Sequence, residues 1–134
     1  MGFTTTEATS ILTEKTNNIY IGLSQTTPTE NGLNFTEPSA SSGYERSYLS
    51  STDRDLSISA QISNKKIIFF NESIGAGYGT VTHFGLFKTA STTTPFFTGP
   101  LAAPLTIAEG YIPIFRAHKF VIALDKEVLE EYES

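Results

Sequence analysis

Two histidines, His83 and His118, are the only imidazoles in this chain and the first candidates for chemistry. A histidine that acts as a general base needs a nucleophile and an orienting carboxylate beside it, and one that binds a metal needs further ligands. Serines and acids occur throughout the chain and identify no partner, while the absence of cysteine excludes thiol catalysis and cysteine zinc sites. The sequence favours His83 as a strand residue hydrogen-bonded to the backbone or to a tyrosine, with metal binding as the alternative.

Glu37 and Arg46 lie on either side of a turn at Gly43 and carry opposite charges. Together with Tyr44 and Tyr48, they could form a polar and aromatic surface that recognises a saccharide. The simpler interpretation is an ion pair that ties the preceding long loop to the body of the protein. The sequence favours the ion pair and leaves saccharide recognition as the alternative.

Two further patterns are weak. Glu37, Asp53 and Asp55 could supply the carboxylates of a glycosidase, but nothing in their spacing supports that activity. The run 75–80 has the glycine content of a phosphate-binding loop, yet it contains no lysine and precedes a strand, whereas phosphate-binding loops precede a helix. We predict a turn at residues 75–80, and no catalytic residue, metal ligand or cofactor site in the chain.

The charge distribution argues against nucleic acid as a partner. The net charge is −5 over 134 residues, and residues 125–134 alone contain five acids and one lysine, so the rest of the chain is nearly neutral. Such an acidic tail is usually solvated, and a contact with a basic partner or a divalent ion is the alternative. No apolar run approaches the ~18 residues of a membrane span, and the first residues lack a secretion signal. We therefore expect a protein made in the cytoplasm, with no membrane contact.

A series of short strands must position these residues. The run Gly79–Lys88 is the densest in β-branched and aromatic residues, and it predicts a strand buried on both faces. Gly85 within it indicates that a bulky group, such as an aromatic ring of a facing sheet, comes close. Eight other segments have strand character: Ile19–Leu23, Tyr44–Leu49, Leu56–Ala60, Lys65–Asn71, Phe96–Gly99, Pro104–Ile107, Tyr111–Phe115 and His118–Leu124.

Short strands at intervals of about ten residues predict an all-β fold, a two-sheet antiparallel sandwich of jelly-roll type. We expect one domain over residues 1–134, with a short N-terminal helix in residues 1–16 and a helical or frayed acidic tail at 125–134. The stretch Ser24–Ser42 is polar and rich in turn residues, which predicts a long exposed loop. Leu33 and Phe35 are the large apolar residues of this loop, so we predict that they anchor it, either on its own sandwich or on a neighbouring virion subunit. Glu37 and Arg46 are predicted to lie near each other at the base of the loop.

Four sequence blocks follow one another in a fixed order: Tyr20–Thr29, the pair Thr36–Ser39 and Gly43–Arg46, the strand Gly79–Phe87, and the turn Glu109–Gly110 with the final strand Val121–Asp125. In this order they resemble a family of small tailed-bacteriophage virion proteins, which are usually described as tail, tail-fibre or baseplate proteins. The resemblance covers about residues 8–125. The chain departs from the family at Phe69–Phe70, which replaces a plainer strand, and at the additional acidic tail.

The resemblance implies a structural component of a bacteriophage virion, does not imply an enzyme and does not fix the place in the particle. Our functional hypothesis is a non-enzymatic structural protein in a tail tip, baseplate or tail fibre. We expect partners among other virion proteins. The apolar, β-rich chain has edge strands around Pro113 and a thin amphipathic N-terminal helix that needs a partner surface, which predicts a symmetric homo-oligomer, with a trimer slightly preferred over larger rings. The alternatives are a carbohydrate-binding module that contacts a host-surface glycan, a capsid decoration protein, and a part of a tail-like bacteriocin. A glycan-binding module would present an exposed aromatic shelf, for which Tyr44, Tyr48, Tyr78 and Tyr111 are the candidates.

Overall fold

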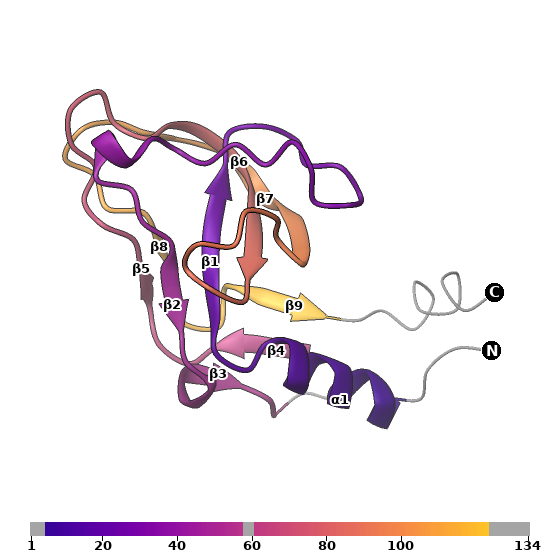
Figure 1. Cartoon of the computed structure of the whole chain (residues 1–134). Coiled ribbons are helices and arrows are strands. Elements are labelled where there is room, and N and C mark those ends of the chain that lie inside the picture. Colours follow the sequence, from indigo (N-terminus) through magenta and orange to yellow (C-terminus); the bar gives the residue numbers. More distant parts are fainter. Residues whose placement is uncertain (1–4, 58–60, 124–134) are drawn as a thin grey trace. The chain divides into compact units, whose positions relative to one another are not determined.

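The computed structural model describes residues 5–57 and 61–123. In this part of the chain one α-helix precedes a series of strands that form three antiparallel sheets (Figure 1). The predicted all-β fold with antiparallel sheets and a short N-terminal helix is therefore confirmed. The acidic tail at 125–134 and Leu124 lie outside the described residues.

Most of the predicted elements are present, although several are shorter than the sequence indicated. The α-helix α1 (Thr5–Lys15) confirms the predicted N-terminal helix over its described residues. Two 3-10 helices, η1 and η2, lie between the first strands. The remaining elements are β1 (Ile19–Ser24), η1 (Ala40–Ser42), β2 (Ser47–Leu49), η2 (Ser51–Asp53), β3 (Arg54–Asp55), β4 (Gln61–Asn64), β5 (Ile68–Phe69), β6 (Gly79–Phe87), β7 (Phe97–Ile107), β8 (Ile114–Phe115) and β9 (Val121–Ala123).

The chain divides into two compact units, and the larger one contains residues 19–49 and 69–114. Its four-stranded sheet has the order β2-β1-β6-β7, with β6 paired to β1 on one side and to β7 on the other. The predicted central strand is confirmed as β6, because β-branched and aromatic residues fill both of its faces. The buried residues of β1 and β6 are Ile19, Ile21, Leu23, Val81, Phe84, Leu86 and Phe87.

One strand in this sheet differs from the prediction. The segments Phe96–Gly99 and Pro104–Ile107 were expected to be separate strands, because prolines interrupt them, but residues 97–99 and 104–107 belong to the single strand β7, and Phe96 precedes it. β7 is at the edge of the sheet, where a proline does not remove a needed ladder hydrogen bond. The register shifts between Val81 and His83, so β7 bulges away from β6 between its two paired halves.

The second unit contains residues 1–18, 50–68 and 115–134, of which the structure describes those from 5 to 18, 50 to 57, 61 to 68 and 115 to 123. Its sheet has the order β3-β4-β9, and α1 packs against β4. Arg54 of β3 is buried and donates hydrogen bonds to the Thr13 carbonyl and the Thr16 hydroxyl at the end of α1. A cation at the C-terminus of a helix is favourable, so Arg54 fixes α1 to the sheet. Burial lowers the pKa of its guanidinium from its ordinary value.

Three predicted strands are corrected. Leu56 and Ser57 are not in a strand, because the Asp55 side chain accepts the Ser57 N–H and turns the chain, and residues 58–60 lie outside the description. The strand expected at 65–71 is reduced to β5, and the strand expected at 111–115 is reduced to β8. β5 is not fully buried, since Phe69 is 60% exposed. The prediction of one domain over 1–134 stays a prediction.

Candidate functional site

Two glycines that are paired on neighbouring strands of the central sheet make room for the site. Gly22 of β1 lies opposite Gly85 of β6. A Cβ atom on Gly85 would lie 2.7 Å from the ring of Phe35, and one on Gly22 would lie 2.9 Å from a carboxylate oxygen of Glu37 and 3.0 Å from the Tyr44 hydroxyl. The missing side chains therefore let the long loop reach the sheet. The sequence correctly predicted a ring beside Gly85, but the ring comes from the loop.

The centre of the site is a bidentate ion pair between Glu37 and Arg46. Arg46 Nη2 lies 2.8 Å from Glu37 Oε1, and Arg46 Nε lies 3.1 Å from Glu37 Oε2. The guanidinium carbon lies 3.4 Å from the centre of the Phe87 ring, and Nη1 donates to the Thr89 carbonyl. The Arg46 side chain is 9% exposed and the Glu37 side chain 23%, so the ion pair is largely shielded from solvent. It joins the loop to β6.

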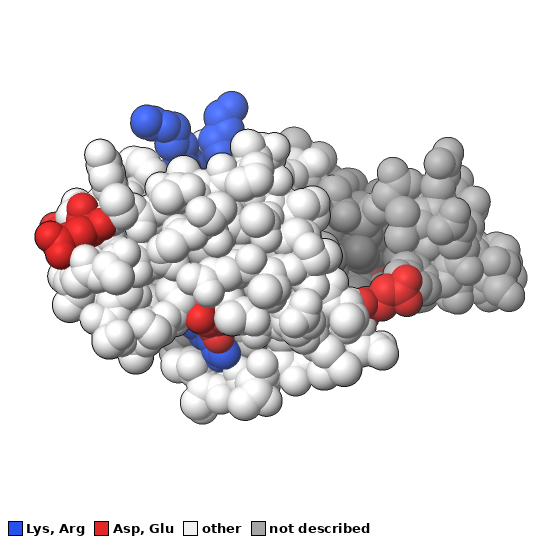
Figure 2. Space-filling model, turned by 90° about the horizontal axis from the view of Figure 1, so that it is seen from above, with Lys and Arg blue, Asp and Glu red and all other residues white. Residues whose placement is uncertain are grey.

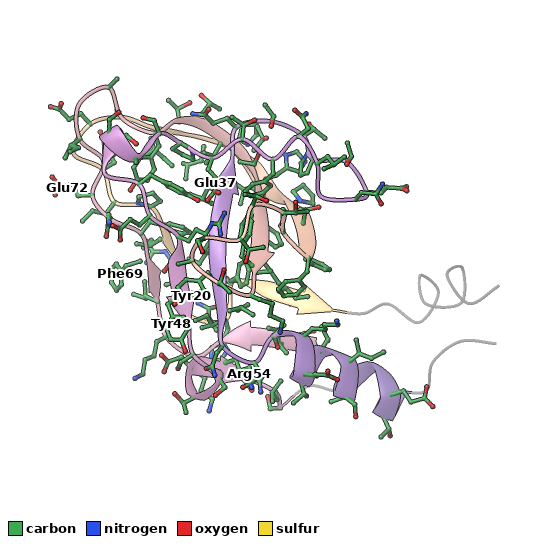
Figure 3. The ribbon with its side chains drawn as sticks, in the orientation of Figure 1. Tyr20, Glu37, Tyr48, Arg54, Phe69 and Glu72 are labelled. Atoms are coloured by element: carbon green, nitrogen blue, oxygen red, sulfur yellow. The ribbon has the colours of Figure 1, made fainter. Side chains whose placement is uncertain are left out.

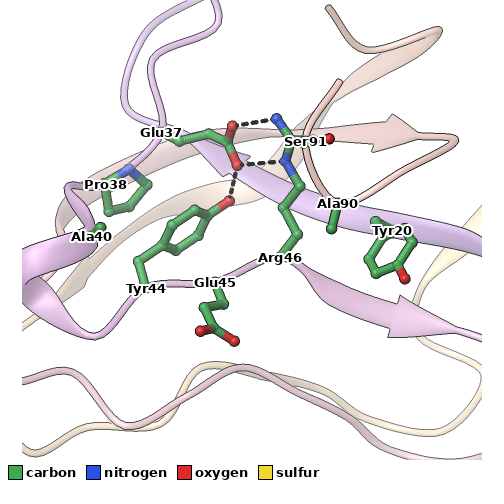
Figure 4. Close-up of a pocket in the computed structure, with 9 residues that line it drawn as sticks. All are labelled: Tyr20, Glu37, Pro38, Ala40, Tyr44, Glu45, Arg46, Ala90 and Ser91. Carbon is green, nitrogen blue, oxygen red and sulfur yellow. Dashed lines mark hydrogen bonds and ion pairs between the residues drawn. The ribbon is translucent and has the colours of Figure 1, made fainter. Parts of the chain in front are cut away.

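Tyr44 connects this ion pair to the central sheet. Its hydroxyl donates to Glu37 Oε2 at 2.5 Å (Figure 4). The same hydroxyl accepts the backbone N–H of Leu23 at 2.9 Å. Burial, followed by the hydrogen bond to the Glu37 carboxylate, raises the pKa of Tyr44 far above its ordinary value. The phenol therefore keeps its proton and remains a donor throughout the physiological pH range. We call Glu37, Tyr44 and Arg46 the loop lock.

Replacing Tyr44 by phenylalanine is expected to lower the free energy of unfolding by about 1–3 kcal/mol at neutral pH, because Glu37 loses a donor and the Leu23 N–H loses its acceptor. The folded-state pKa of Tyr44 is raised, so its contribution is complete below the ordinary phenol pKa of 10.0 and is lost as the pH rises above it. The stability difference between wild type and Tyr44→Phe should therefore narrow above that pH. Urea denaturation from neutral to alkaline pH measures this, and a difference independent of pH would contradict the assignment.

A cleft of about 600 Å³ lies beside the loop lock. Its walls are Tyr20 of β1, residues 37, 38 and 40 of the long loop, residues 44–46 before β2, and residues 90–91 after β6 (Figure 4). Alternation along 44–46 directs Tyr44 and Arg46 to the side of Glu37, while Glu45 points away. All of these segments belong to the larger unit.

The structure places the other predicted site residues separately. Phe35 packs edge-on against Phe87, with ring centroids 5.4 Å apart, whereas Leu33 is 59% exposed in the loop. Tyr48 and Tyr111 are exposed at 52% and 66%, and Tyr48 lies 5.0 Å from the ring of Tyr20. Figure 3 shows Tyr20 and Tyr48 beside each other on neighbouring strands.

The expectation that four tyrosines form an exposed shelf needs correction. Tyr44 and Tyr78 are only 7% and 1% exposed. Their phenol groups are directed inward, because Tyr44 binds Glu37 and Tyr78 donates to the Asn71 carbonyl. A tyrosine can be buried when its hydroxyl finds a partner, and alternation alone did not reveal those partners.

Among the residues that the structure describes, neither histidine has the surroundings of a catalytic base. His83 Nδ1 lies 2.8 Å from the Thr82 hydroxyl, a partner that the sequence did not indicate. His118 Nδ1 lies 3.3 Å from the Ser63 hydroxyl and 3.4 Å from an Asp55 carboxylate oxygen. A catalytic triad needs the serine and the carboxylate on different ring nitrogens. Within residues 5–57 and 61–123, no group of three or more His, Asp or Glu side chains is placed to hold a metal ion.

An apolar hollow of about 400 Å³ was not predicted. It is lined by the end of β7, residues 105–107, and by residues 111–114. Four of these side chains are exposed, Leu105, Tyr111, Ile112 and Ile114. The uninterrupted apolar run at 111–114 was the available signal, but it was interpreted as an edge strand because it contains Pro113.

Comparison with protein families decides the classification. A family model described as Podophage GP4 fiber I protein gp80 matches residues 5–123, which includes every residue that the structure describes. The chain belongs to this family. No curated protein gives a significant match.

Membership of the podophage fibre family confirms the resemblance to tailed-phage tail and fibre proteins. It makes the chain a phage structural component, and proteins of such fibre families are generally structural. The matched residues include the whole loop lock and the two glycines beside it, Gly22 and Gly85. The match ends before the acidic tail. No helix in the described part of the chain has the length and apolarity needed to cross a membrane.

Proposed function

We propose that this chain is a non-enzymatic structural component of a phage tail fibre, and that it assembles through contacts with copies of itself and with other virion proteins. The family match over residues 5–123 is the observation that carries the proposal. The loop lock supports it, because the polar groups of Glu37, Tyr44 and Arg46 bind one another and hold the loop. The protein is made in the host cytoplasm and resides in the virion.

The apolar hollow is the surface that we assign to self-association. Leu105, Tyr111, Ile112 and Ile114 are exposed at 47%, 66%, 49% and 38%, and no residue that lines the hollow is charged. Adjacent exposed apolar side chains of this kind mark interaction surfaces in soluble proteins. Leu33, exposed in the long loop, is a second apolar residue that can contact a neighbouring subunit.

A second copy of the chain is the occupant that the charges favour. No charged residue lines the hollow, so two copies can meet there without bringing like charges together. Figure 2 shows that one face of the molecule likewise has few charged side chains. The bulge and the two prolines of β7 disfavour edge-to-edge strand pairing. We therefore propose a face contact in a symmetric oligomer, with a trimer slightly preferred over larger rings.

Light scattering of the purified protein tests self-association. We expect an oligomer at micromolar concentration, and we expect Ile112→Asp to dissociate it, because the substitution places a charge in the apolar contact. Ile67→Asp is the matched control, since Ile67 is similarly exposed, at 42%, and does not line the hollow. A folded wild-type monomer over this range, or equal dissociation by both substitutions, would contradict the proposed interface.

A further inference from the structure

Four basic residues of the smaller unit lie on two turns that one buried asparagine holds together. Asn64 is fully buried, and its side-chain amide donates to the Lys66 and Arg116 carbonyls at 2.8 and 2.9 Å. Its backbone carbonyl accepts the His118 N–H at 2.7 Å, and the Lys119 N–H bonds to the Arg116 carbonyl. The bend after β4 is therefore fixed beside the turn before β9.

The side chains on these two turns form an exposed cationic surface. We call this surface the basic patch, and its members are Lys65, Lys66, Arg116 and Lys119. Lys66 Nζ lies 3.7 Å from an Asp53 carboxylate oxygen, and an Asp55 carboxylate oxygen lies 3.4 Å from His118 Nδ1. Within the described residues, the other three cations of the patch form no ion pair. The patch therefore has positive charge that its own surroundings do not compensate.

The charges of the chain are unevenly divided. The described residues of the smaller unit include six Lys or Arg and four Asp or Glu, which gives a net charge of +2. The larger unit has two Lys or Arg and five Asp or Glu, which gives −3. The acidic tail at 125–134 supplies −4 with five acids and one lysine. The one positive part of the chain is thus followed directly by its most negative segment.

We propose that the basic patch binds the acidic tail of the same chain. β9 ends at Ala123, which pairs with Gln61, whereas the patch lies beyond Asn64 at the other end of β4. These two ends of β4 are about 10 Å apart. The eleven residues 124–134 can span up to roughly 36 Å, so the carboxylates at 127–133 can reach the patch.

The covalent connection favours the chain's own tail over the tail of another copy. A short tether holds its end at an effective concentration in the millimolar range, far above that of a second copy in dilute solution. Each exposed ion pair contributes little, so the contact needs several pairs at once and weakens in salt. It shields the patch from polyanions such as nucleic acid, which basic surfaces bind non-specifically. This inference concerns the smaller unit and does not rest on the proposed role in the fibre.

Paramagnetic NMR of the full chain tests the contact. The chain contains no cysteine, so Ser134→Cys provides a single attachment point for a nitroxide label, with the reduced label as the diamagnetic reference. We expect the amide signals of residues 65–66 and 116–119 to be broadened at about 0.01 M salt and to recover at about 1 M. The reason is that the Debye length falls from about 30 Å to about 3 Å over this range.

Charge variants show whether the patch itself holds the tail. Lys119→Glu should reduce the broadening at least about twofold, because it reverses one charge of the patch. Lys88→Glu is the matched control, since Lys88 is an exposed lysine of the larger unit, and it should leave the broadening unchanged. A further variant leaves every described residue intact, exchanges the tail carboxylates for amides and should remove the salt-dependent broadening. Its substitutions are Asp125→Asn, Glu127→Gln, Glu130→Gln, Glu131→Gln and Glu133→Gln.

Three results would overturn this assignment. The first is the same broadening in low and high salt, which a tethered but unbound tail would give. The second is salt-dependent broadening that persists in the amide variant, or that Lys119→Glu and Lys88→Glu change equally, with native-like spectra for all variants. The third is broadening of similar strength when ¹⁵N-labelled chains without nitroxide are mixed with unlabelled chains that carry it, since the tail would then bind a neighbouring copy.

Discussion

Replacing Phe87 by alanine is expected to lower the free energy of unfolding by about 3–5 kcal/mol. The Phe87 side chain is fully buried in β6, so the substitution loses its transfer free energy and leaves a cavity. The ring also supports the Arg46 guanidinium on one side and packs against Phe35. The cavity would therefore affect the core of the sheet and the attachment of the long loop together.

Urea denaturation of Phe87→Ala measures this effect, with Phe69→Ala as the matched control. Phe69 is 60% exposed, so its truncation should change the stability by less than about 0.5 kcal/mol. A loss below about 1 kcal/mol for Phe87→Ala would show that β6 is not the centre of the core. Similar losses for both variants would contradict the burial difference between the two phenylalanines.

Arg46→Ala is expected to lower the free energy of unfolding by about 3 kcal/mol. The substitution leaves the Glu37 carboxylate with one donor, Tyr44, in a shielded position beside the sheet. This value is at the lower end for a broken buried pair because 23% of the Glu37 side chain is still exposed. The Thr89 carbonyl also loses its donor.

Two further variants separate the ion pair from a general effect of truncation. Glu45→Ala should change the stability by less than about 0.5 kcal/mol, because Glu45 is exposed and points away from the loop lock. In the double variant Glu37→Gln with Arg46→Met, no charge is left unpaired, so it should be more stable than Arg46→Ala. A double variant that is less stable than Arg46→Ala would contradict this explanation of the loop lock.

The sequence was most informative where one element carries a strong local pattern. β6 was recognised because its β-branched and aromatic residues lie between clear turns, and α1 because its apolar residues recur at helical spacing. The alternation of buried Phe120 and Ile122 with exposed Val121 likewise identified β9. These features depend on residues that are close in sequence, which is why a single sequence reveals them.

The site depends on pairings between distant residues, which periodicity does not reveal. Gly22 and Gly85 are individually ordinary strand glycines, and only the β1–β6 register places them opposite each other. The position of Arg46 over Phe87 likewise depends on how the loop returns to the sheet. The merger of two predicted strands into β7 has a similar cause, because a proline is compatible with a strand only when that strand is at an edge.

Locating the protein in the intact phage particle tests the central claim most directly. Electron cryomicroscopy of the virion, with an antibody against the chain as a marker, gives its position and copy number. We predict that the antibody labels the tail fibre, and that fibre density fits several symmetry-related copies of the unit formed by residues 19–49 and 69–114. Labelling of the head, or particles that contain none of the protein, would contradict a structural role in the fibre.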